Sequence, residues 1–498
     1  MNKKFSVSPL TNKSFQIPKN NDDSVGLNEF LSHNKEKKII VVQGLGFVGA
    51  VMSLVCANAI HEDYAVIGID LASQESFWKI KSINEGDFPL IADDPKIEEF
   101  FENTKIKKNF YATYDPSAYS YADIIIVDIN LDVQKNSLDD YSIDSFDVDL
   151  SSFKQAISVI GKNMNPNALI IVETTVPPGT CQNIVKPIIE AELKIRESFN
   201  DQIFLGHSYE RVMPGPEYID SIRCYPRVYS GINKLSADKV EKFLNTIIDV
   251  KKCTLTRLEH TNATEIAKVL ENSYRATNIA FAIEWSRFAE EAGVDLYSIV
   301  HAIRERDTHS NLMFPGVGVG GYCLTKDPLL ASWARKNFFD ANDDLEMSIG
   351  SVSKNDMMPV FAFKRAKIVF GDFKNKNVLF FGVSYRGDVG DTRYSPVKNL
   401  VDLVKKDGAN IELHDPFIPF WEEINSIVEI KLDKALSSRT DMIIISTNHK
   451  QYSSDDTIKK IMSMKQIEIF DTVGALKEHQ LEKLSKKHKV SVLGRGDY

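Results

Sequence analysis

The chain has 498 residues, of which 43% are hydrophobic and 26% charged, and its formal net charge is −9 at pH 7. This length predicts about three domains, and the acidic balance excludes nucleic acid as the main partner, because a nucleic-acid-binding surface needs a basic excess. No apolar run approaches the ~18 residues of a membrane helix, so we expect no membrane partner. The five cysteines show no Cys-x-x-Cys spacing, which favours reduced thiols in a cytoplasmic protein and no metal site.

The first half of the chain predicts a parallel sheet. Residues 1–37 are polar and lack the apolar stretch of a signal peptide, so we expect a flexible tail or an oligomer arm there. Apolar runs then follow at residues 39–42, 65–70, 123–128 and 168–172, with helical stretches that include 48–60 and 236–250. Buried runs separated by helices are typical of a doubly wound sheet.

The second half predicts a long helix and a second sheet. The pattern from residue 260 to about 292 is helical without proline, which indicates a helix linking two domains and also serving as a dimer face. Strands are expected at residues 378–383, 410–413, 441–446 and 468–471. The predicted fold class is α/β, with two Rossmann-like doubly wound domains joined by a long central helix in a helical middle domain. The expected boundaries are 1–37, 38–255, 256–365 and 366–498.

A glycine-rich turn indicates dinucleotide binding. Gly44, Gly46 and Gly49 follow the first strand and open a helix, where the backbone N–H groups of residues such as Phe47 and Val48 can hold a pyrophosphate. Asp70 ends the second strand, 21 residues after Gly49, where an acid binds the ribose hydroxyls of NAD and repels the 2′-phosphate of NADP. We therefore predict NAD as the cofactor. The alternative is a glycine turn that only packs the helix on the sheet.

Cys323 is a candidate covalent nucleophile. It follows a glycine-rich run at residues 316–321 and precedes Lys326 and Asp327 by three and four residues. Glycines let a ligand approach the backbone, and a nearby lysine can lower the pKa of a thiol. A thiol and a nicotinamide in one chain suggest oxidation through a thioester. The alternative is a cysteine that packs as a small hydrophobe.

Other polar side chains carry weaker signals. Lys268 and Asn272 lie four apart in the long helix and share a face, where a buried lysine can stabilise an oxyanion. Thr175 follows a strand end, and Glu210 is a candidate base or water-positioning group. Each of these has a solvated or turn-forming alternative.

Two arginines follow the strand at residues 378–383. Arg386 and Arg393 could grip a diphosphate by bidentate contacts. Surface salt bridges explain them equally well when they are considered alone.

In this order, the segments resemble the family of UDP-glucose, GDP-mannose and UDP-N-acetylhexosamine 6-dehydrogenases over roughly residues 37–498. The resemblance implies a four-electron oxidation, in which the C6 alcohol of a nucleotide sugar becomes a carboxylate with two NAD⁺ and one water. It implies that Cys323 attacks the C6 aldehyde, and that the thiohemiacetal is oxidised to a thioester and hydrolysed.

The resemblance also implies roles for the remaining residues. Lys268 and Asn272 stabilise the oxyanion, and Asp327 acts as a base or orients water. Glu210 assists hydrolysis. The NAD-binding domain is 38–255, the central domain is 256–365 and the UDP-sugar-binding domain is 366–498. The expected substrate-binding residues are Arg211, Gly320, Arg386 and Arg393, and Thr175 and Lys326 are expected near NAD.

The loop at residues 210–215, Glu-Arg-Val-Met-Pro-Gly, resembles the loop of the N-acetylhexosamine branch. This implies a UDP-N-acetylhexosamine as substrate, a product that feeds a polysaccharide or glycan, and a homodimer or higher homo-oligomer; UDP-glucose is the alternative. Residues 127–130, Val-Asp-Ile-Asn, replace the V-x-T-P of the family, and Tyr209 replaces a proline. A nucleotide-sugar-binding protein without turnover and a two-electron hydroxy-acid dehydrogenase are the other hypotheses.

Overall fold

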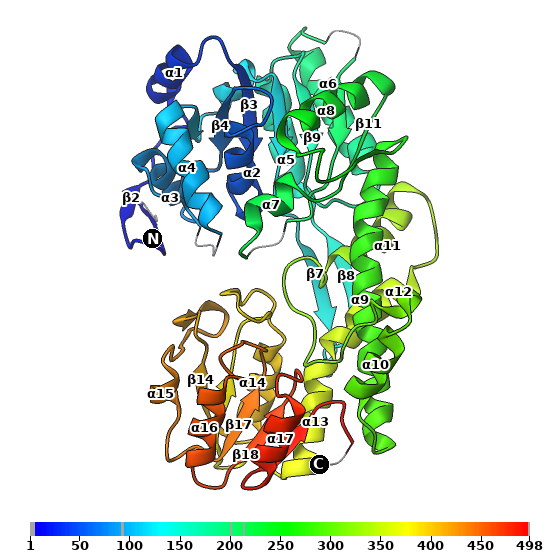
Figure 1. Ribbon diagram of the computed structural model, residues 1–498. Helices are drawn as coiled ribbons and strands as arrows, with labels where there is room; N and C mark the ends of the chain where they lie inside the picture. The colour runs from blue at the N-terminus through cyan, green and yellow to red at the C-terminus, as the bar shows by residue number, and fades with distance from the viewer. Residues whose placement is uncertain (1–4, 91–93, 200–201, 213–214, 497–498) are drawn as a thin grey trace. The chain divides into compact units, whose positions relative to one another are not determined.

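Two mainly parallel sheets, each covered by helices, organise the part of the chain that the structure describes (Figure 1). The computed structural model describes residues 5–90, 94–199, 202–212 and 215–496. The chain divides into two units. The first contains residues 1–132, 148–269 and 337–340, and the second contains residues 133–147, 270–336 and 341–498. The predicted α/β class with two doubly wound sheets is confirmed.

In the sheet of the first unit, the order in which the chain adds strands reverses at β3. Its strands, in spatial order, are β12 (Leu255–Arg257), β11 (Arg227–Gly231), β10 (Phe204–His207), β9 (Leu169–Val172), β6 (Ile124–Val127), β3 (Lys38–Gln43), β4 (Tyr64–Ile69) and β5 (Phe110–Thr113). All neighbouring strands are parallel except β10 and β11. The chain runs from β3 outward to β5 and returns to β6 on the other side of β3. Ligands bind at the carboxyl ends of strands at such a switch point.

Helices explain why these strands are uniformly apolar. One face shares its core with α2 (Phe47–Ala57), α3 (Phe77–Glu85), α4 (Pro95–Lys107), α7 (Tyr218–Arg223) and α8 (Lys234–Ile247). Two further helices, α5 (Ser151–Asn163) and α6 (Lys186–Ile195), pack against each other. All residues of β4, β6 and β9 are buried, as expected for strands covered on both faces.

The described residues of the N-terminal extension form regular structure. Of the two expectations for this segment, the flexible tail is therefore wrong for the described residues, and the oligomer arm stays a prediction. β1 (Phe5–Val7) and β2 (Ser14–Gln16) form an antiparallel hairpin beside α3 (Figure 1). The Ser6 hydroxyl donates to Gln74 O (2.6 Å) and accepts from Trp78 N (3.0 Å). The next element, α1 (Ser24–His33), is anchored through Asp23, whose carboxylate accepts from the hydroxyls of Tyr111 (2.8 Å) and Thr113 (2.7 Å).

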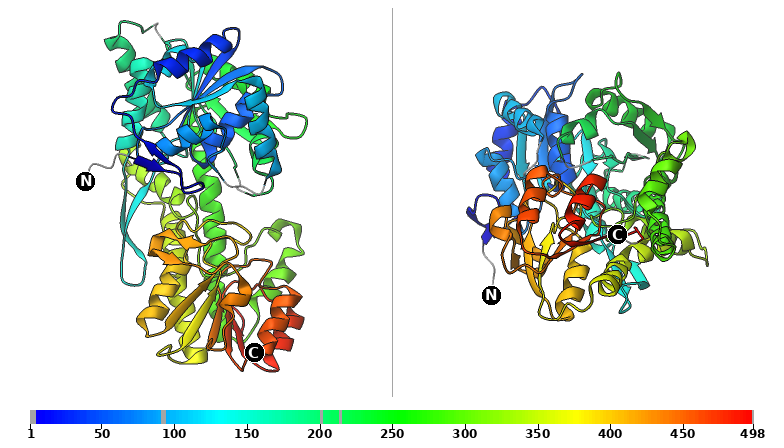
Figure 2. Two further views of the ribbon diagram at one scale, coloured as in Figure 1. Left: turned by 90° about the vertical axis from the view of Figure 1, so that its left-hand side faces the viewer. Right: turned by 60° about the horizontal axis from the view of Figure 1, so that its bottom comes forward.

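The second unit repeats the doubly wound pattern. Its five strands, in spatial order, are β14 (Asn410–His414), β13 (Asn377–Phe381), β17 (Met442–Ile445), β18 (Glu468–Asp471) and β19 (Lys489–Val492), all parallel. One face packs on α13 (Met358–Phe370) and α14 (Val397–Lys406), and the other packs on α16 (Asp455–Ser463) and α17 (Glu478–Ser485). Figure 2 shows these helices in yellow on one side of the sheet and in orange and red on the other.

The predicted long helix is α9 (Thr261–Glu291), which begins in the first unit and ends in the second. It is followed by α10 (Leu296–Arg304), α11 (Asp327–Phe338) and α12 (Glu346–Asp356). A hairpin of β7 (Val133–Ser137) and β8 (Ile143–Val148) was not predicted. It joins the second unit through Lys135, whose ammonium lies 2.6 Å from the Asp356 carboxylate, and through Asp147, which accepts from the Trp333 indole (2.7 Å).

Candidate functional site

The three glycines of the loop after β3 each meet a different physical demand. Gly44 has φ +97°, and a Cβ there would overlap the carbonyl of Asp128. A Cβ on Gly49 would overlap the Gly44 carbonyl, so Gly49 lets α2 pack tightly on the loop. A Cβ on Gly46, the N-cap of α2, would meet no atom within 4 Å, which leaves the helix N-terminus open. Phe47 and Val48 then form the first turn of α2. This geometry fits the pyrophosphate of a dinucleotide.

Asp70 lies beside this loop, directly after β4. Its carboxylate accepts from Leu45 N (3.0 Å) and from Leu71 N (2.7 Å). The Gly44 N–H donates to Ile69 O (2.8 Å), which holds the ends of β3 and β4 together. The acid and the glycine loop therefore sit at adjacent strand ends, the arrangement that the sequence predicts for binding the adenosine side of NAD.

Thr175 lies in the turn after β9, where it is half-buried. The same turn is held by Glu265 of α9, whose carboxylate accepts from Gly179 N (2.6 Å) and Cys181 N (2.8 Å). Burial raises the pKa of Glu265 to about 7, although these two hydrogen bonds favour its charged form. Glu265 thus fixes the Pro-Pro-Gly turn to α9, a role that the sequence did not reveal.

Glu210 and Lys268 meet in the first unit. The Lys268 ammonium donates to Glu210 O (2.9 Å) and lies 3.9 Å from Glu210 Oε1. Both side chains are nearly buried, with 10% and 13% of the lysine and glutamate side chains exposed. The Tyr209 ring faces two cations: the Lys268 ammonium lies 5.4 Å and the Arg211 guanidinium 5.5 Å from the centre of the ring.

Arg211 is half-buried and donates to Pro226 O and to the Tyr209 hydroxyl (3.4 Å). Residues 213 and 214 of the predicted sugar loop, Met213 and Pro214, lie outside the described residues. In the described part of this loop, the Arg211 side chain packs against the Tyr209 ring.

A buried charged group near this loop escaped the sequence analysis. Glu173 follows β9 and forms an ion pair with Arg227 of β11, with 2% of each side chain exposed. Asp128 follows β6 and has one carboxylate oxygen, Oδ2, that is buried without a hydrogen-bond partner. The only sequence signal for this group was the Asp128 departure from the family motif.

Cys323 lies in the second unit, four residues before α11 begins, and its residue surface is exposed. Its carbonyl accepts from Lys326 N (3.2 Å) and Asp327 N (2.9 Å), which folds the segment into a turn. None of the five cysteines, all of which the structure describes, is in a disulfide. Burial raises the pKa of the Cys56 and Cys181 thiols, which disfavours their reactive thiolate forms. Cys323, which is exposed, is the better candidate nucleophile.

Asp327 organises the polar side chains behind Cys323. It is fully buried, and its two oxygens accept from Asn272 Nδ2 (2.7 Å) and from the Lys326 ammonium (2.8 Å). Asn272 lies one turn after Lys268 in α9. A buried carboxylate held by an amide and an ammonium is a fixed hydrogen-bond acceptor suited to orienting a neighbouring group.

Arg393 and Gly320 also lie near Cys323 in the second unit. The Arg393 carbonyl accepts from Gly321 N (2.9 Å), and its guanidinium is within electrostatic reach of Cys323. A Cβ on Gly320 would overlap Tyr385, so glycine is required there. Arg386 is exposed in the loop after β13. The structure therefore brings Cys323, Asp327, Lys326, Asn272 and Arg393 together in the second unit, and Glu210 with Lys268 in the first.

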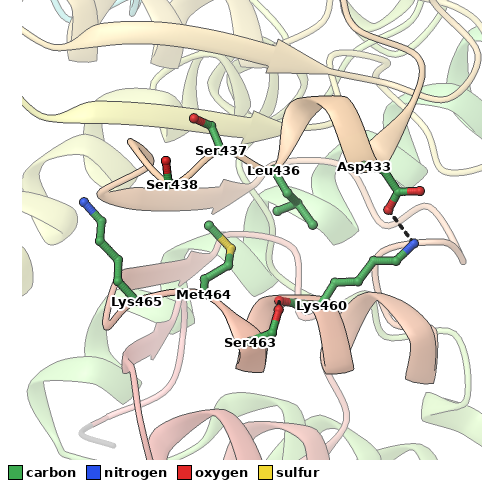
Figure 3. Close-up of a pocket in the computed structure, with 8 residues that line it drawn as sticks. All are labelled: Asp433, Leu436, Ser437, Ser438, Lys460, Ser463, Met464 and Lys465. Carbon is green, nitrogen blue, oxygen red and sulfur yellow. Dashed lines mark hydrogen bonds and ion pairs between the residues drawn. The ribbon is translucent and has the colours of Figure 1, made fainter.

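A separate cavity of about 360 Å³ lies between α15 (Leu432–Ala435) and α16, as Figure 3 shows. Its lysines already have acidic partners, with Lys460 2.7 Å from Asp433 and Lys465 2.7 Å from Asp441. Predicted site residues do not line this cavity. Within the described part of the chain, no cluster of His, Cys, Asp or Glu has the geometry of a metal site. No described helix has the length and apolar character to cross a bilayer.

Comparison with known families matches three consecutive domains. Residues 37–247 match the NAD binding domain of the UDP-glucose/GDP-mannose dehydrogenase family, residues 262–343 match its central domain, and residues 379–478 match its UDP binding domain.

Individual relatives match over nearly their whole length. A UDP-N-acetyl-D-mannosamine dehydrogenase of Methanococcus maripaludis is 28% identical over 470 residues, which cover 93% of this chain and 98% of the relative. An NDP-N-acetyl-D-galactosaminuronic acid dehydrogenase of Ralstonia nicotianae is 24% identical over 84% of this chain and 93% of the relative. The solved structure of a UDP-D-ManNAc dehydrogenase from Pyrococcus horikoshii is 26% identical in sequence and superposes with a TM-score of 0.75. The match covers 92% of this chain and 100% of the Pyrococcus chain.

Proposed function

Because the chain belongs to the UDP-glucose/GDP-mannose dehydrogenase family and is an NAD-dependent nucleotide-sugar dehydrogenase, we propose that it oxidises the C6 hydroxyl of a UDP-N-acetylhexosamine to a carboxylate. The observation that carries this choice of sugar is the match along 98% of a UDP-N-acetyl-D-mannosamine dehydrogenase. The Glu210-Arg211-Val212 start of the sugar loop supports it. When bound at the glycine loop, NAD⁺ supplies the hydride acceptor for both oxidations.

Cys323 is the proposed nucleophile. After the alcohol has lost a hydride and a proton, the thiolate adds to the aldehyde carbon and the oxygen takes up a proton, which gives a thiohemiacetal. Loss of a second hydride and a proton gives the thioester, and water cleaves it to the carboxylate and the free thiol. The accessible position of Cys323 ahead of α11 supports this role.

Lys268 and Asn272 are the proposed oxyanion-stabilising groups. Both are donors, they lie one turn apart on α9, and each is held by an anchoring partner, the Glu210 carbonyl for Lys268 and the Asp327 carboxylate for Asn272. Preorganised donors of this kind stabilise developing negative charge without reorganising during the reaction. Asp327 positions Asn272 and Lys326, and Glu210 orients the hydrolytic water.

The test is the stoichiometry of NADH formation with a limiting sugar. We expect two NADH per UDP-N-acetylmannosamine or another UDP-N-acetylhexosamine, measured by absorbance at 340 nm. Two NADH with UDP-glucose alone would support the mechanism but show that the substrate is UDP-glucose and not a UDP-N-acetylhexosamine. One NADH per sugar would remove the thioester route, and binding of both ligands with no NADH would favour the silent binding protein suggested by residues 127–130.

Three further properties are part of the proposal. The product supplies a uronic acid to a polysaccharide or glycan, because oxidised nucleotide sugars are donors for glycosyl transfer. The chain acts in the cytoplasm, where reduced cysteines persist. Finally, it forms a homodimer through the exposed apolar side chains of α9, since large apolar side chains in a row mark an interaction face.

A further inference from the structure

Three ionisable side chains gather beneath the glycine loop: Glu173 and Arg227 are buried, and Asp128 is half-buried with one buried carboxylate oxygen. β6 and β9 are parallel neighbours in which Val127 lies opposite Val172, so the next residues, Asp128 and Glu173, follow adjacent strands. The side chains of Glu173 and its ion-pair partner Arg227 are each only 2% exposed. We call these three residues, Asp128, Glu173 and Arg227, the strand-end triad.

Each member of the triad has a buried polar atom without a hydrogen-bond partner, and the triad contains two carboxyl groups but one guanidinium. Asp128 Oδ2, Glu173 Oε2 and Arg227 Nη1 are all buried without a hydrogen-bond partner. One guanidinium faces two carboxyl groups, so a buried negative charge stays uncompensated when both are ionised. A proton on one carboxyl removes that charge.

Asp128 is the member that keeps the proton. Burial raises the pKa of Asp128 to about 8, the negative charge of Glu210 acts in the same direction, and Arg227 opposes both. The titratable group that faces Asp128 from α2 is Cys56. Burial also raises the pKa of the Cys56 thiol. Glu173 approaches from β9, Glu210 from the loop after β10 and Arg227 from β11, where burial lowers the arginine pKa to about 10. At neutral pH, Asp128 is therefore neutral and Arg227 is charged.

This carboxyl group costs stability at neutral pH. The folded pKa of Asp128 lies above its unfolded value of 3.8, so its contribution to stability is largest below that value. The contribution falls as the pH rises from about 4 to about 8 and is constant above. A neutral amide of the same shape would avoid this loss. A carboxyl group whose buried oxygen has no hydrogen-bond partner, at a strand end where such sheets bind ligands, points to a functional role.

The triad connects the NAD loop to the Glu210 loop. On one side, Asp128 contacts Gly44 and Gly49, whose missing Cβ atoms leave room for it. On the other side, Arg227 Nε donates to Ser208 Oγ (3.1 Å) and Arg227 Nη2 donates to Ser208 O (3.4 Å). Ser208 lies two residues before Glu210 in the same segment.

We propose that protonated Asp128 is a positioning residue that, through Arg227 and Ser208, holds the Glu210 loop in the geometry needed for thioester hydrolysis. This inference rests on the proposed function of Glu210. When the proton leaves Asp128, the second negative charge competes for Arg227 and loosens its hold on Ser208. Hydrolysis then slows while the hydride transfers remain.

The full-length Asp128→Asn variant tests the proposal, because asparagine keeps the shape and neutrality of the protonated acid. The ratio of its hydrolysis rate to the wild-type rate, measured in single turnovers by acid-quenched product analysis, is expected near one at pH 6.5. We expect the ratio to rise at least threefold between pH 8 and 9.5, where wild-type Asp128 ionises. Asp123→Asn, at the opposite end of the same strand, is the matched control and should give a pH-independent ratio.

A second variant and a second readout keep the proposal testable. Ser208→Ala should slow hydrolysis at least threefold at pH 7 while leaving NAD affinity unchanged. The melting temperature of Asp128→Asn minus that of the wild type should increase from pH 5 to pH 8 and then level off. A flat hydrolysis ratio, or wild-type hydrolysis in Ser208→Ala, overturns the proposal. If no UDP-sugar yields NADH, the proposed function fails with the Glu210 link, whereas the melting difference still decides whether Asp128 holds the proton.

Discussion

Cys323 is the residue on which the chemistry depends, and its replacement should separate binding from turnover. In Cys323→Ser, the hydroxyl is a poorer nucleophile and its ester is cleaved slowly. We expect turnover to fall at least about a hundredfold, with unchanged dissociation constants for NAD and the UDP-sugar. Stopped-flow NADH absorbance and isothermal titration measure the two effects.

Cys224→Ser is the matched control, because Cys224 lies in the first unit, is only half-buried and has a pKa that burial raises. Its turnover should equal that of the wild type. A Cys323→Ser enzyme with full activity would exclude covalent catalysis by this thiol.

His207 should make the first unit sensitive to acid. It is fully buried at the end of β10, its Nδ1 lies 2.8 Å from Thr264 Oγ1, and burial, reinforced by the charge of Lys268, lowers its pKa to about 3. A lowered folded pKa contributes stability above the unfolded pKa of about 6.5, and this stability is lost as the pH falls from there towards 3. The slope reaches about 1.4 kcal/mol per pH unit.

We therefore expect His207→Asn to flatten the loss of stability between pH 6.5 and 5, measured by urea unfolding followed through hydrogen exchange of β10 peptides. Substitution of the exposed His61 by asparagine is the control and should retain the wild-type slope. Equal slopes for His207→Asn and the wild type would show that His207 does not control acid stability.

Single residues were predictable where a local pattern has one physical cause. Gly44, Gly46 and Gly49 lie between a strand and a helix, as their spacing predicts, because that spacing follows from a tight turn on a helix N-terminus. Their role in NAD binding stays a prediction. Arg227 was missed, because its partner Glu173 lies 54 residues earlier and the two strands are joined only by the fold. Long-range ion pairs leave no periodic trace in a sequence.

Among the elements, the N-terminal hairpin should influence NAD binding from outside the glycine loop. Ser6 bonds to Gln74 and Trp78, which lie on the segment that follows Asp70. Loss of a buried hydrogen-bonding partner costs about 1–3 kcal/mol, so Ser6→Ala should loosen that segment. We expect the dissociation constant for NAD to rise about three- to tenfold, with unchanged affinity for UDP.

Fluorescence titration measures this change. Ser32→Ala in α1, where the hydroxyl donates to Glu29 O of the same helix, is the control. An unchanged NAD affinity in Ser6→Ala would limit the hairpin to a structural role.

The α9 helix should form a dimer contact. Large apolar side chains recur along it with roughly half of their surface exposed, namely Leu270 (63%), Tyr274 (55%), Phe281 (52%), Trp285 (46%) and Phe288 (59%). Full burial of one such side chain contributes about 1.5–3 kcal/mol. The double variant Phe281→Glu and Trp285→Glu should therefore shift the mass measured by light scattering from dimer to monomer.

Ile106→Glu, at another exposed apolar position, is the control for a general effect of added charge. A wild-type mass in the double variant, or a monomeric wild type, would remove α9 from the assembly.

Elements were predictable where the burial of both faces produced an unbroken apolar run, as in β6 and β17. The hairpins escaped prediction because their partly exposed strands lack such runs. β1 and β2 have mixed burial, and β7 and β8 are mostly polar. The first pair is held by the backbone N–H of Trp78 in α3, and the second by residues of α11 and α12. Only the folded chain provides these contacts.

At the scale of the whole molecule, each unit has its own sheet, core and strand-order switch, and this predicts that the two ligands protect different parts of the chain. NAD should slow hydrogen exchange in peptides that contain Gly44–Gly49 and Asp70, whereas UDP should protect those around Arg386 and Arg393. A ligand at one hundred times its dissociation constant stabilises the state that binds it by about 2.7 kcal/mol, which corresponds to about a hundredfold slower exchange through unfolding of that unit.

Exchange measured by mass spectrometry with NAD alone, UDP alone and both ligands distinguishes the possibilities. Protection by UDP confined to the first unit would reverse the assigned roles of the two sheets. Protection of the Cys323 segment only when both ligands are present would mean that the nucleophile is ordered by the ternary complex. In that case the thiol becomes committed to reaction only after the sugar and the cofactor have bound, which limits its exposure to other aldehydes and oxidants.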